Sequence, residues 1–403
     1  AASAWFTGGY LELVGTLFDA AIRRQEVTVA AGDQNVEHGV TFTIQRGPVS
    51  IKVGSTSGGA EYVSERELQT GTYSYAFTPT GNFHIELAGR AQAKSLVDSV
   101  AVDSAGDFVL PGPWGANDLD NLRWAPSGNV LFISCEGFQQ RRLERPTSAA
   151  PRSWGISLYQ PNDGPFRGIN TTTIKLTPSA LTGDITLTAS RPLFDSTHVG
   201  ALFSNTSTGQ TVAATLTGED EFTDENSMRI IGVGDSRLFT IEISGRTDST
   251  ITLQRSISVP GDWTDVTTFV LDQAATNFDD GLDNQIIYYR IGIKTGDYGT
   301  DTVVVTLVST SGGIKGVVRI TAFTSVTSVS AAVLSNLGGT GASRDWQEGS
   351  WSDFRGFPSG VAFYEGRLWW GGKGFFFGSI SDGFDLFDED FEGDGGPINR
   401  SIA

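Results

Sequence analysis

Hydrophobic and polar residues alternate with a period of two over much of the first hundred residues, and glycine or proline interrupts the alternation. Four stretches show it clearly: 40–44, 49–53, 71–77 and 83–87. Because successive side chains of a β-strand point to opposite faces, this pattern predicts short strands with one buried face. Strands at this spacing, separated by turns such as Gly47-Pro48, are typical of a sandwich or jelly roll. We therefore predict an N-terminal β-sandwich over residues 1–110.

One short stretch in this region allows a helix instead. Leu13, Leu17, Ala20 and Ala21 would share one face of a helix over 11–24. The stretch is too short and too mixed in character to decide between the two, so a helix stays an alternative there.

The rest of the chain divides by pattern into four further segments. Residues 111–168 predict a connecting segment of turns and strands, with Asp or Asn placed to cap a short helix, and 169–228 a small β module. Residues 229–340 predict an immunoglobulin- or fibronectin-like β-sandwich. The strands expected there are 238–243, 251–257, 267–271, 286–293, 303–308 and 317–323. We predict a multidomain all-β protein whose last segment, 341–403, begins a propeller or barrel.

The last segment is rich in aromatic residues. Trp346 to Pro358 and Val361 to Gly372 are aromatic stretches bracketed by glycine and proline turns, as in a propeller blade or barrel hairpin. The sequence stops at Ala403, soon after this pattern begins. We therefore expect a piece of a larger closed β architecture.

Composition and charge narrow the function classes. The 403 residues include 50 glycines, 28 basic and 46 acidic residues, for a formal net charge of −18. Such an excess of acid argues against binding to nucleic acid or to an anionic membrane. No apolar run approaches the roughly 18 residues that a bilayer span needs. The first residue is Ala1 and no signal-peptide pattern follows, so we expect a processed or omitted N-terminus.

Candidate catalytic residues are few. The single cysteine, Cys135, lies in an apolar strand pattern and is expected to be a small core residue rather than a nucleophile. The three histidines, His38, His84 and His198, each fall within a strand or turn pattern. No nucleophilic triad, nucleotide loop or zinc spacing appears. We therefore expect no enzyme activity, catalytic residue or cofactor.

Two acidic stretches raise the question of a metal. Residues 279–284 read Asp-Asp-Gly-Leu-Asp-Asn, and residues 388–399 place acids at the first, third and fifth positions with Gly393 sixth, as in a calcium loop. The second stretch has Asn399 where the loop needs a bidentate glutamate. A solvated acidic loop is the favoured interpretation of both, and no metal site is predicted.

Five residues are candidates for a subunit interface. Arg141, Arg142 and Arg145 form a basic tract in an acidic chain, which favours a contact with an acidic neighbouring subunit. Contact with DNA and an ordinary ion pair within the domain are the alternatives. Trp114 and Trp351 are expected at core edges or interfaces, and sugar stacking is the alternative for them and for the other exposed tryptophans.

Several stretches together resemble a known family. They are 46–59, 70–81, 113–124, 130–145, 162–165 and 346–372. In this order they resemble tail proteins of short-tailed bacteriophages, of the nozzle or distal tail-tube type. The resemblance implies a propeller combined with β-sandwich domains, and a ring of six subunits that continues the DNA channel below the portal and adaptor. A full member of the family completes its propeller beyond residues 367–370, which this chain does not.

The resemblance implies a structural component of the virion, assembled in the host cytoplasm. Expected partners are other copies of the chain in a hexameric ring, the adaptor, the tail fibre and, without specific binding, double-stranded DNA in passage. An acidic surface suits such a channel because carboxylates repel phosphates over about 8–10 Å at physiological salt. Two rivals remain: a host-surface glycan-binding adhesin with exposed tryptophans, and a glycosidase, which needs two facing carboxylates roughly 5–10 Å apart.

Overall fold

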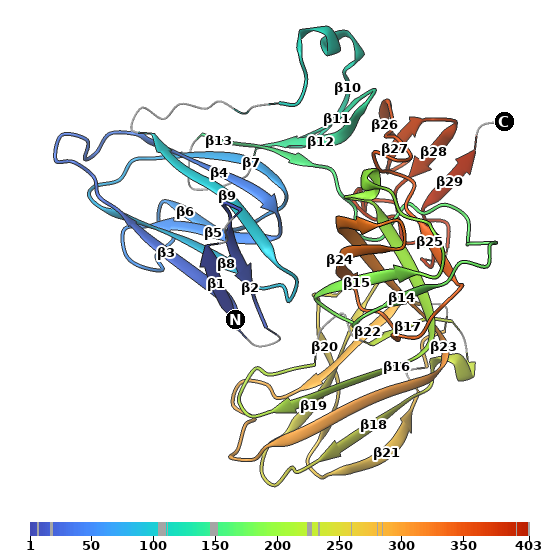
Figure 1. The fold of residues 1–403 in the computed structure, drawn as a ribbon. Helices are drawn as coiled ribbons and strands as arrows, with labels where there is room; N and C mark the ends of the chain where they lie inside the picture. The colour runs from blue at the N-terminus through green and yellow to red at the C-terminus, as the bar shows by residue number, and fades with distance from the viewer. Residues whose placement is uncertain are drawn as a thin grey trace. The chain divides into compact units, whose positions relative to one another are not determined.

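The computed structural model shows a chain that divides into two compact units (Figure 1). Unit 1 comprises Ala1–Gln160, Gly356–Phe376 and Arg400–Ala403, and unit 2 comprises Pro161–Arg355 and Phe377–Asn399. The structure describes residues 1–5, 8–16, 19–103, 110, 112–145, 152–223, 228–232, 234–258, 260–279, 281–283, 285–391 and 393–401. Strands dominate these residues. The helices among them are three short 3-10 turns at Ala116–Asn121, Ser196–His198 and Gly234–Arg237.

Unit 1 contains a β-sandwich, drawn in blue in Figure 1. Its larger sheet has nine antiparallel strands in the order β1-β2-β9-β4-β7-β13-β12-β11-β10. These strands are β1 (Ala2–Trp5), β2 (Leu11–Val14), β4 (His38–Arg46), β7 (Gly71–Phe77), β9 (Ser95–Asp103), β10 (Arg123–Ser127), β11 (Val130–Cys135), β12 (Phe138–Glu144) and β13 (Ser153–Leu158). The smaller sheet, in the order β3-β8-β5-β6, comprises β3 (Ala21–Val27), β5 (Val49–Gly54), β6 (Val63–Leu68) and β8 (Phe83–Gly89).

The sandwich core follows from the alternation in the sequence. Val40, Phe42 and Ile44 of β4 are fully buried, and every second residue of β5 meets them from the other sheet. Burying apolar area of this kind is the main favourable term in folding. The four alternating stretches predicted to be strands are confirmed as β4, β5, β7 and β8.

The helix considered for 11–24 is wrong. Leu11 and Leu13 are both buried in β2, while Glu12 and Val14 are partly exposed, which is a period of two. β3 begins at Ala21 and pairs with β8 over its whole length. Cross-strand pairing therefore decides the conformation here, and Leu17 of the expected helical face lies outside the described residues.

Unit 1 also contains an extension of the larger sheet. β10 to β13 continue it beyond the sandwich, and one of their faces packs on the hairpin of β26 (Gly360–Tyr364) and β27 (Arg367–Gly372). The ring of Phe132 lies 5.8 Å from that of Phe363 and 6.4 Å from that of Trp370, both edge-on. The aromatic residues of the predicted propeller segment thus form a core with the connecting segment.

The aromatic C-terminal segment forms one four-stranded sheet. Its order is β26-β27-β28-β29, and the two further strands are β28 (Phe375–Gly378) and β29 (Ile398–Ser401). A four-stranded antiparallel sheet is also the unit from which a propeller is built.

Unit 2 contains two further sheets. The larger has the order β14-β15-β24-β23-β16-β25, with β18 pairing both β23 and β21, and the smaller has the order β17-β22-β19-β20. Their strands are β14 (Leu176–Pro178), β15 (Asp184–Ala189), β16 (Leu202–Leu216), β17 (Met228–Ile230), β18 (Phe239–Ser244), β19 (Ile251–Ile257), β20 (Thr264–Phe269), β21 (Gln273–Phe278), β22 (Ile287–Gly292), β23 (Val303–Ser325), β24 (Ser328–Ser335) and β25 (Trp346–Glu348).

Two long strands pass through both cores of unit 2. β16 pairs with β23 in two runs, and the register shifts between Thr208 and Gln210, where Gly209 has a φ of +79°. Such a bulge bends a strand and increases its twist. On one side of it Phe203 packs in the core formed with β15 and β24, and on the other Leu216 packs in the sandwich formed with the smaller sheet.

This arrangement differs from the strands expected over 229–340. The two strands expected at 303–308 and 317–323 are one continuous strand, β23, and the sandwich recruits β16 from the preceding segment. β21 was not expected because most of its side chains are exposed, which leaves no alternation to detect. The structure divides the chain into two compact units, which is coarser than the five predicted segments. The division into five segments therefore stays a prediction.

Candidate functional site

The register of the extension separates the predicted arginines onto opposite faces of the sheet. Arg142 pairs with Phe132 and Ser157, on the face that continues into the sandwich core. Arg141 pairs with Ile133 and Leu158, on the outer face. Adjacent residues of a strand always divide in this way, so the basic tract is not one patch.

We call the outer surface of β10 to β13 the Arg141 face. Directly paired residues share a face, which places nine side chains there. They are Trp124, Pro126, Leu131, Ile133, Arg141, Leu143, Trp154, Ile156 and Leu158. Eight are apolar and Arg141 lies among them.

The Arg141 face is only partly covered by its own side chains. Trp124 is 62% exposed and Trp154 is 42% exposed, whereas Ile133 and Ile156 on the same face are buried at 8% each. Arg141 is half-buried, and its guanidinium donates to the carbonyl oxygens of the neighbouring Gln139 (3.2 Å) and Gln140 (3.5 Å).

The charge of Arg141 is partly desolvated. Burial lowers the pKa of its guanidinium. No carboxylate of the described residues forms an ion pair with it. The charge on this face is therefore compensated by backbone carbonyls alone within the described part of unit 1.

The remaining predicted interface residues do not join this face. Arg142 forms an ion pair with Glu144 at 3.4 Å, and Arg145 follows the strand end with its amide bound to Asn129. Trp114 is half-buried next to a 3-10 turn that Asp118 caps through the Gly115 amide, as the sequence predicts. Trp351 belongs to unit 2, where its ring packs edge-on against Phe377 and Phe387. The structure thus does not unite the five residues.

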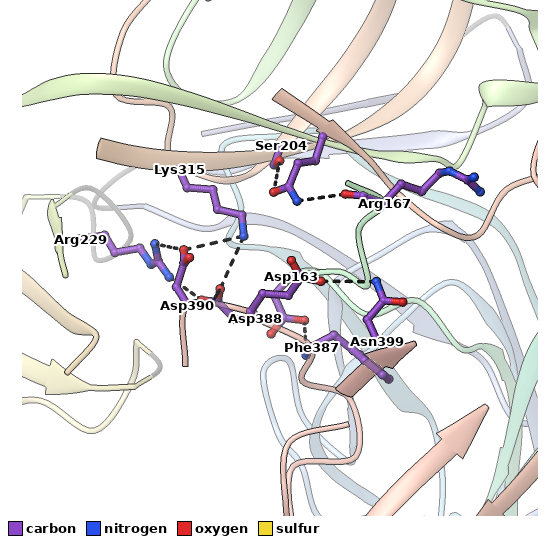
Figure 2. A network of polar contacts seen from close by, with 11 residues as sticks. Asp163, Arg167, Ser204, Arg229, Lys315, Phe387, Asp388, Asp390 and Asn399 are labelled. Atoms are coloured by element: carbon purple, nitrogen blue, oxygen red, sulfur yellow. Dashed lines mark hydrogen bonds and ion pairs between the residues drawn. The ribbon is translucent and has the colours of Figure 1, made fainter. Parts of the chain in front are cut away.

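A second polar site lies within unit 2 (Figure 2). Arg229 of β17 is 4% exposed and binds Asp388 at 2.5 Å and Asp390 at 3.1 Å. Lys315 of β23 approaches the same two carboxylates at 3.9 and 3.7 Å and lies 5.1 Å from the centre of the Phe166 ring. We call these four charged residues the Arg229 network.

The carboxylates of this network change the pKa of the groups packed against them. Burial alone would lower the pKa of Arg229, but Asp388 and Asp390 raise it above its ordinary value. Asp163 accepts a hydrogen bond from the Phe387 amide at 3.0 Å. Burial of its carboxyl group and the nearby charge of Asp388 raise the pKa of Asp163 to about 7, although the residue as a whole is only partly buried.

Further polar contacts in Figure 2 hold loops of unit 2 together. The Asn399 side chain donates to the Phe166 carbonyl at 2.7 Å, and Gln347 links the Ser204 hydroxyl to the Arg167 carbonyl. The Arg229 network and the Asn399 contact thus attach the segment 387–399 to β17, β23 and Phe166, while Gln347 ties β16 to residue 167.

The loop 388–399 is only partly solvated. Asp388 and Asp390, its first and third positions, are ion-paired with side chains 17% and 30% exposed, whereas Glu389 and Asp394 are exposed. Across the residues that the structure describes, which leave out Glu392, no group of three His, Cys, Asp or Glu side chains could hold a metal ion. In 279–284, Asp279 and Asp283 accept backbone amides, and positions 280 and 284 lie outside the described residues.

A histidine and an arginine share a buried glutamate elsewhere in unit 2. His198 is 1% exposed, its Nδ1 accepts from the Asp195 amide, and its Nε2 lies 3.3 Å from Glu348. The accepting Nδ1 leaves the proton on Nε2, which donates to the carboxylate. Arg355 binds both oxygens of Glu348. Burial raises the pKa of Glu348, but these donors outweigh it and lower the pKa overall.

Sequence reasoning missed several of these residues. Arg229 stands alone in a short apolar strand, and a lone cation of this kind is the signal that could have marked a buried ion pair. Lys315 shares β23 with Arg319 and carries no such signal. Cys135 is buried as predicted, and burial raises the pKa of its thiol. Among the described residues no helix is long and apolar enough to cross a membrane.

Comparisons with known proteins identify no family. No family model and no curated protein matches the chain. Among solved structures, a lectin from Pleurotus ostreatus in complex with GalNAc is 11% identical over 84% of this chain and 80% of its own, with a TM-score of 0.15. Procruciferin, an 11S globulin from Brassica napus, is 9% identical over 78% of this chain and 84% of its own, with a TM-score of 0.16. A TM-score this low supports no conclusion about the fold or the function of this chain.

Proposed function

We propose that this protein is a structural subunit of a short-tailed phage tail, in which copies of the chain form a ring around the path of the DNA. The observation that carries the proposal is the Arg141 face, an apolar sheet surface with two exposed tryptophans and a half-buried arginine among its members. Contiguous exposed apolar surface on a folded domain is typical of protein–protein interfaces. The sequence resemblance supplies the tail as the place of assembly.

The charge of the chain supports the same proposal. An acidic lining would repel the phosphates of DNA over about 8 Å at physiological salt, so DNA would pass without sticking. With a net charge of −18, the chain has enough acidic residues to form such a lining.

Imaging the purified protein and the virion tests the proposal. Negative-stain electron microscopy should show closed rings, with six-fold symmetry expected, and antibody labelling should place the protein in the tail. A protein that stays monomeric at every concentration and is absent from virions would overturn the proposal.

The second candidate function is glycan binding by an adhesion module of the tail. The exposed rings of Trp124 and Trp154 favour it, since sugars stack on exposed aromatic faces. Titration with host polysaccharide, followed by tryptophan fluorescence, separates the two functions. Saturable binding that is lost in Trp124→Ala and Trp154→Ala would support the adhesin, and its absence would support the wall of a tail.

A further inference from the structure

We infer that the Arg229 network is a site of covalent self-modification, in which the amine of Lys315 and the carboxyl group of Asp388 condense to an isopeptide bond within unit 2 (Figure 2). The reaction needs no partner, cofactor or added reactant, and it does not depend on the proposed function. The inference rests on where the amine lies, how the carboxyl group is held, which group relays the protons, and what burial does to the equilibrium.

The amine of Lys315 lies in apolar surroundings beside another cation. The side chain is 10% exposed, and its nitrogen lies 5.1 Å from the centre of the Phe166 ring. Val317, two residues along β23, lies on the same face of the strand and packs with Phe166 and Leu202 in a small apolar cluster. Desolvation in an apolar pocket and a neighbouring cation, here Arg229, are both ways in which proteins activate a lysine as a nucleophile.

The carboxyl group of Asp388 is held by donors on both oxygens. Its Oδ1 accepts from the Asp390 amide at 3.1 Å and lies 3.9 Å from the Lys315 nitrogen, and its Oδ2 accepts from Arg229 at 2.5 Å. A main-chain amide and a guanidinium are donors of the kind that stabilise the negative charge of a tetrahedral intermediate. Asp390 lies slightly closer to the amine, at 3.7 Å, but its side chain is 30% exposed against 17% for Asp388.

Asp163 supplies an acid next to Asp388. Its carboxyl group accepts a hydrogen bond from the amide of Phe387, the residue that precedes Asp388. Burial of this carboxyl group and the nearby charge of Asp388 raise the pKa of Asp163 to about 7. An acid whose pKa lies near the working pH can both give and take a proton, which is what general acid–base catalysis requires.

The condensation balances without any other reactant. The Lys315 ammonium passes one proton to the Asp388 carboxylate, and the neutral amine then attacks the carboxyl carbon. Asp163 protonates the hydroxyl group of the intermediate, which leaves as water, and takes a proton back from the nitrogen. One C–N bond forms, one C–O bond breaks, and no group is oxidised or reduced.

Burial favours the condensed product. Holding the two groups together makes the reaction unimolecular, which is worth effective molarities of up to about 10⁸ M when the groups are well oriented. The water leaves for bulk solvent, and one desolvated charge of each sign disappears. Asp390 remains as the partner of Arg229 at 3.1 Å, so the network stays balanced. The product joins β23 to the segment 387–399 by a covalent bond.

Intact-mass spectrometry of the denatured, full-length wild type tests the inference directly. We expect a mass lower than that of the sequence by one water molecule. A tryptic digest should contain a branched peptide in which residues 295–319, uncleaved after Lys315, are joined to residues 374–400. Fragmentation should place the bond at Asp388. A mass equal to that of the sequence would overturn the inference, and a bond at Asp390 would overturn the choice of carboxyl group.

Two variants and an internal control separate condensation from an ordinary ion pair. Lys315→Arg keeps the charge but has no amine to condense, so its mass should equal that of its sequence. Asp388→Asn should lose ammonia in place of water. Lys294 lies closer to its carboxylate, 2.7 Å from Asp265, but both side chains are more than 40% exposed. Trypsin should therefore cleave fully after Lys294, and a bond there would contradict the role given to burial.

Asp163→Asn tests the proton relay. A relay changes the rate of condensation and not its product, so freshly purified variant should contain an unlinked fraction that falls on incubation, whereas wild type is fully linked. Far-UV circular dichroism checks that each variant is folded. Complete condensation of the fresh variant would remove Asp163 from the reaction. None of these results bears on the assembly of a ring, which imaging tests separately.

Discussion

Two arginines in β-strands of this chain have opposite surroundings. Arg229 in unit 2 is buried and meets two carboxylates from a segment about 160 residues away, whereas Arg141 in unit 1 meets only carbonyls of adjacent residues. The first arrangement attaches one part of the chain to another. The second arrangement leaves the Arg141 charge without a carboxylate partner among the described residues. An arginine paired with carboxylates of its own chain indicates a structural ion pair, whereas one that contacts only carbonyls is a candidate for an interface.

The largest expected effect comes from breaking the Arg229 network. Arg229→Ala would leave Asp388 and Asp390 with Lys315 alone, which approaches no closer than 3.7 Å. Removing one partner of a buried ion pair typically costs about 3–5 kcal/mol. We expect a loss of that size in the free energy of unfolding of unit 2, measured by urea denaturation at neutral pH. A loss below about 1 kcal/mol would show that this network does not hold the segment.

The next effect is a pH dependence in the same region. Because the pKa of Asp163 rises from 3.8 to about 7, the folded state holds a proton that the unfolded state releases. This stabilisation is complete below about pH 4 and disappears as the pH rises through about 7.

Asp163→Asn tests this dependence by keeping the group neutral at every pH. The Asn side chain can still accept from the Phe387 amide, so the thermal midpoint of the variant should exceed that of wild type by about 5 °C at pH 8, and the difference should shrink steadily toward pH 4. Thermal unfolding followed by circular dichroism measures both values. Parallel pH profiles for the two proteins would contradict the assignment.

A smaller effect is expected for an exposed ion pair of the same unit. Lys294 lies 2.7 Å from Asp265, and both side chains are more than 40% exposed. Exposed pairs are screened by solvent and contribute little, so Lys294→Ala should shift the midpoint of urea denaturation far less than Arg229→Ala does. The variant serves as the control for Arg229→Ala, and an equal loss in both would remove the distinction between buried and exposed pairs.

The smallest effect on folding is expected at Arg141. Arg141→Met keeps a long apolar side chain among Ile133 and Leu158 and removes a partly desolvated charge, so the free energy of unfolding should change by about 0.5 kcal/mol or less. A loss of several kcal/mol, seen in the same urea experiment, would show that Arg141 serves the fold of unit 1 instead of a partner.

Many of the strands could be predicted because a strand is specified by the alternation of neighbouring residues. The alternation in 40–44 and 49–53 specifies strands with one buried face, and both β4 and β5 bury that face. Where alternation was weak, prediction failed: 11–24 suggested a helix, and the exposed β21 was not seen. These failures have one cause, since pairing with a distant strand overrides a weak local pattern.

The candidate sites depend on contacts that no local pattern contains. The sequence by itself determined that the chain forms strands, that Cys135 is buried and that acid exceeds base. Only the tertiary structure decided that Arg141 and Arg142 lie on opposite faces of the sheet, which of them faces outward, and that Asp388 meets Arg229. The reason is physical. Side-chain alternation is built into each strand, whereas the identity of the buried face and of an ionic partner is decided by strands folded together from distant parts of the chain.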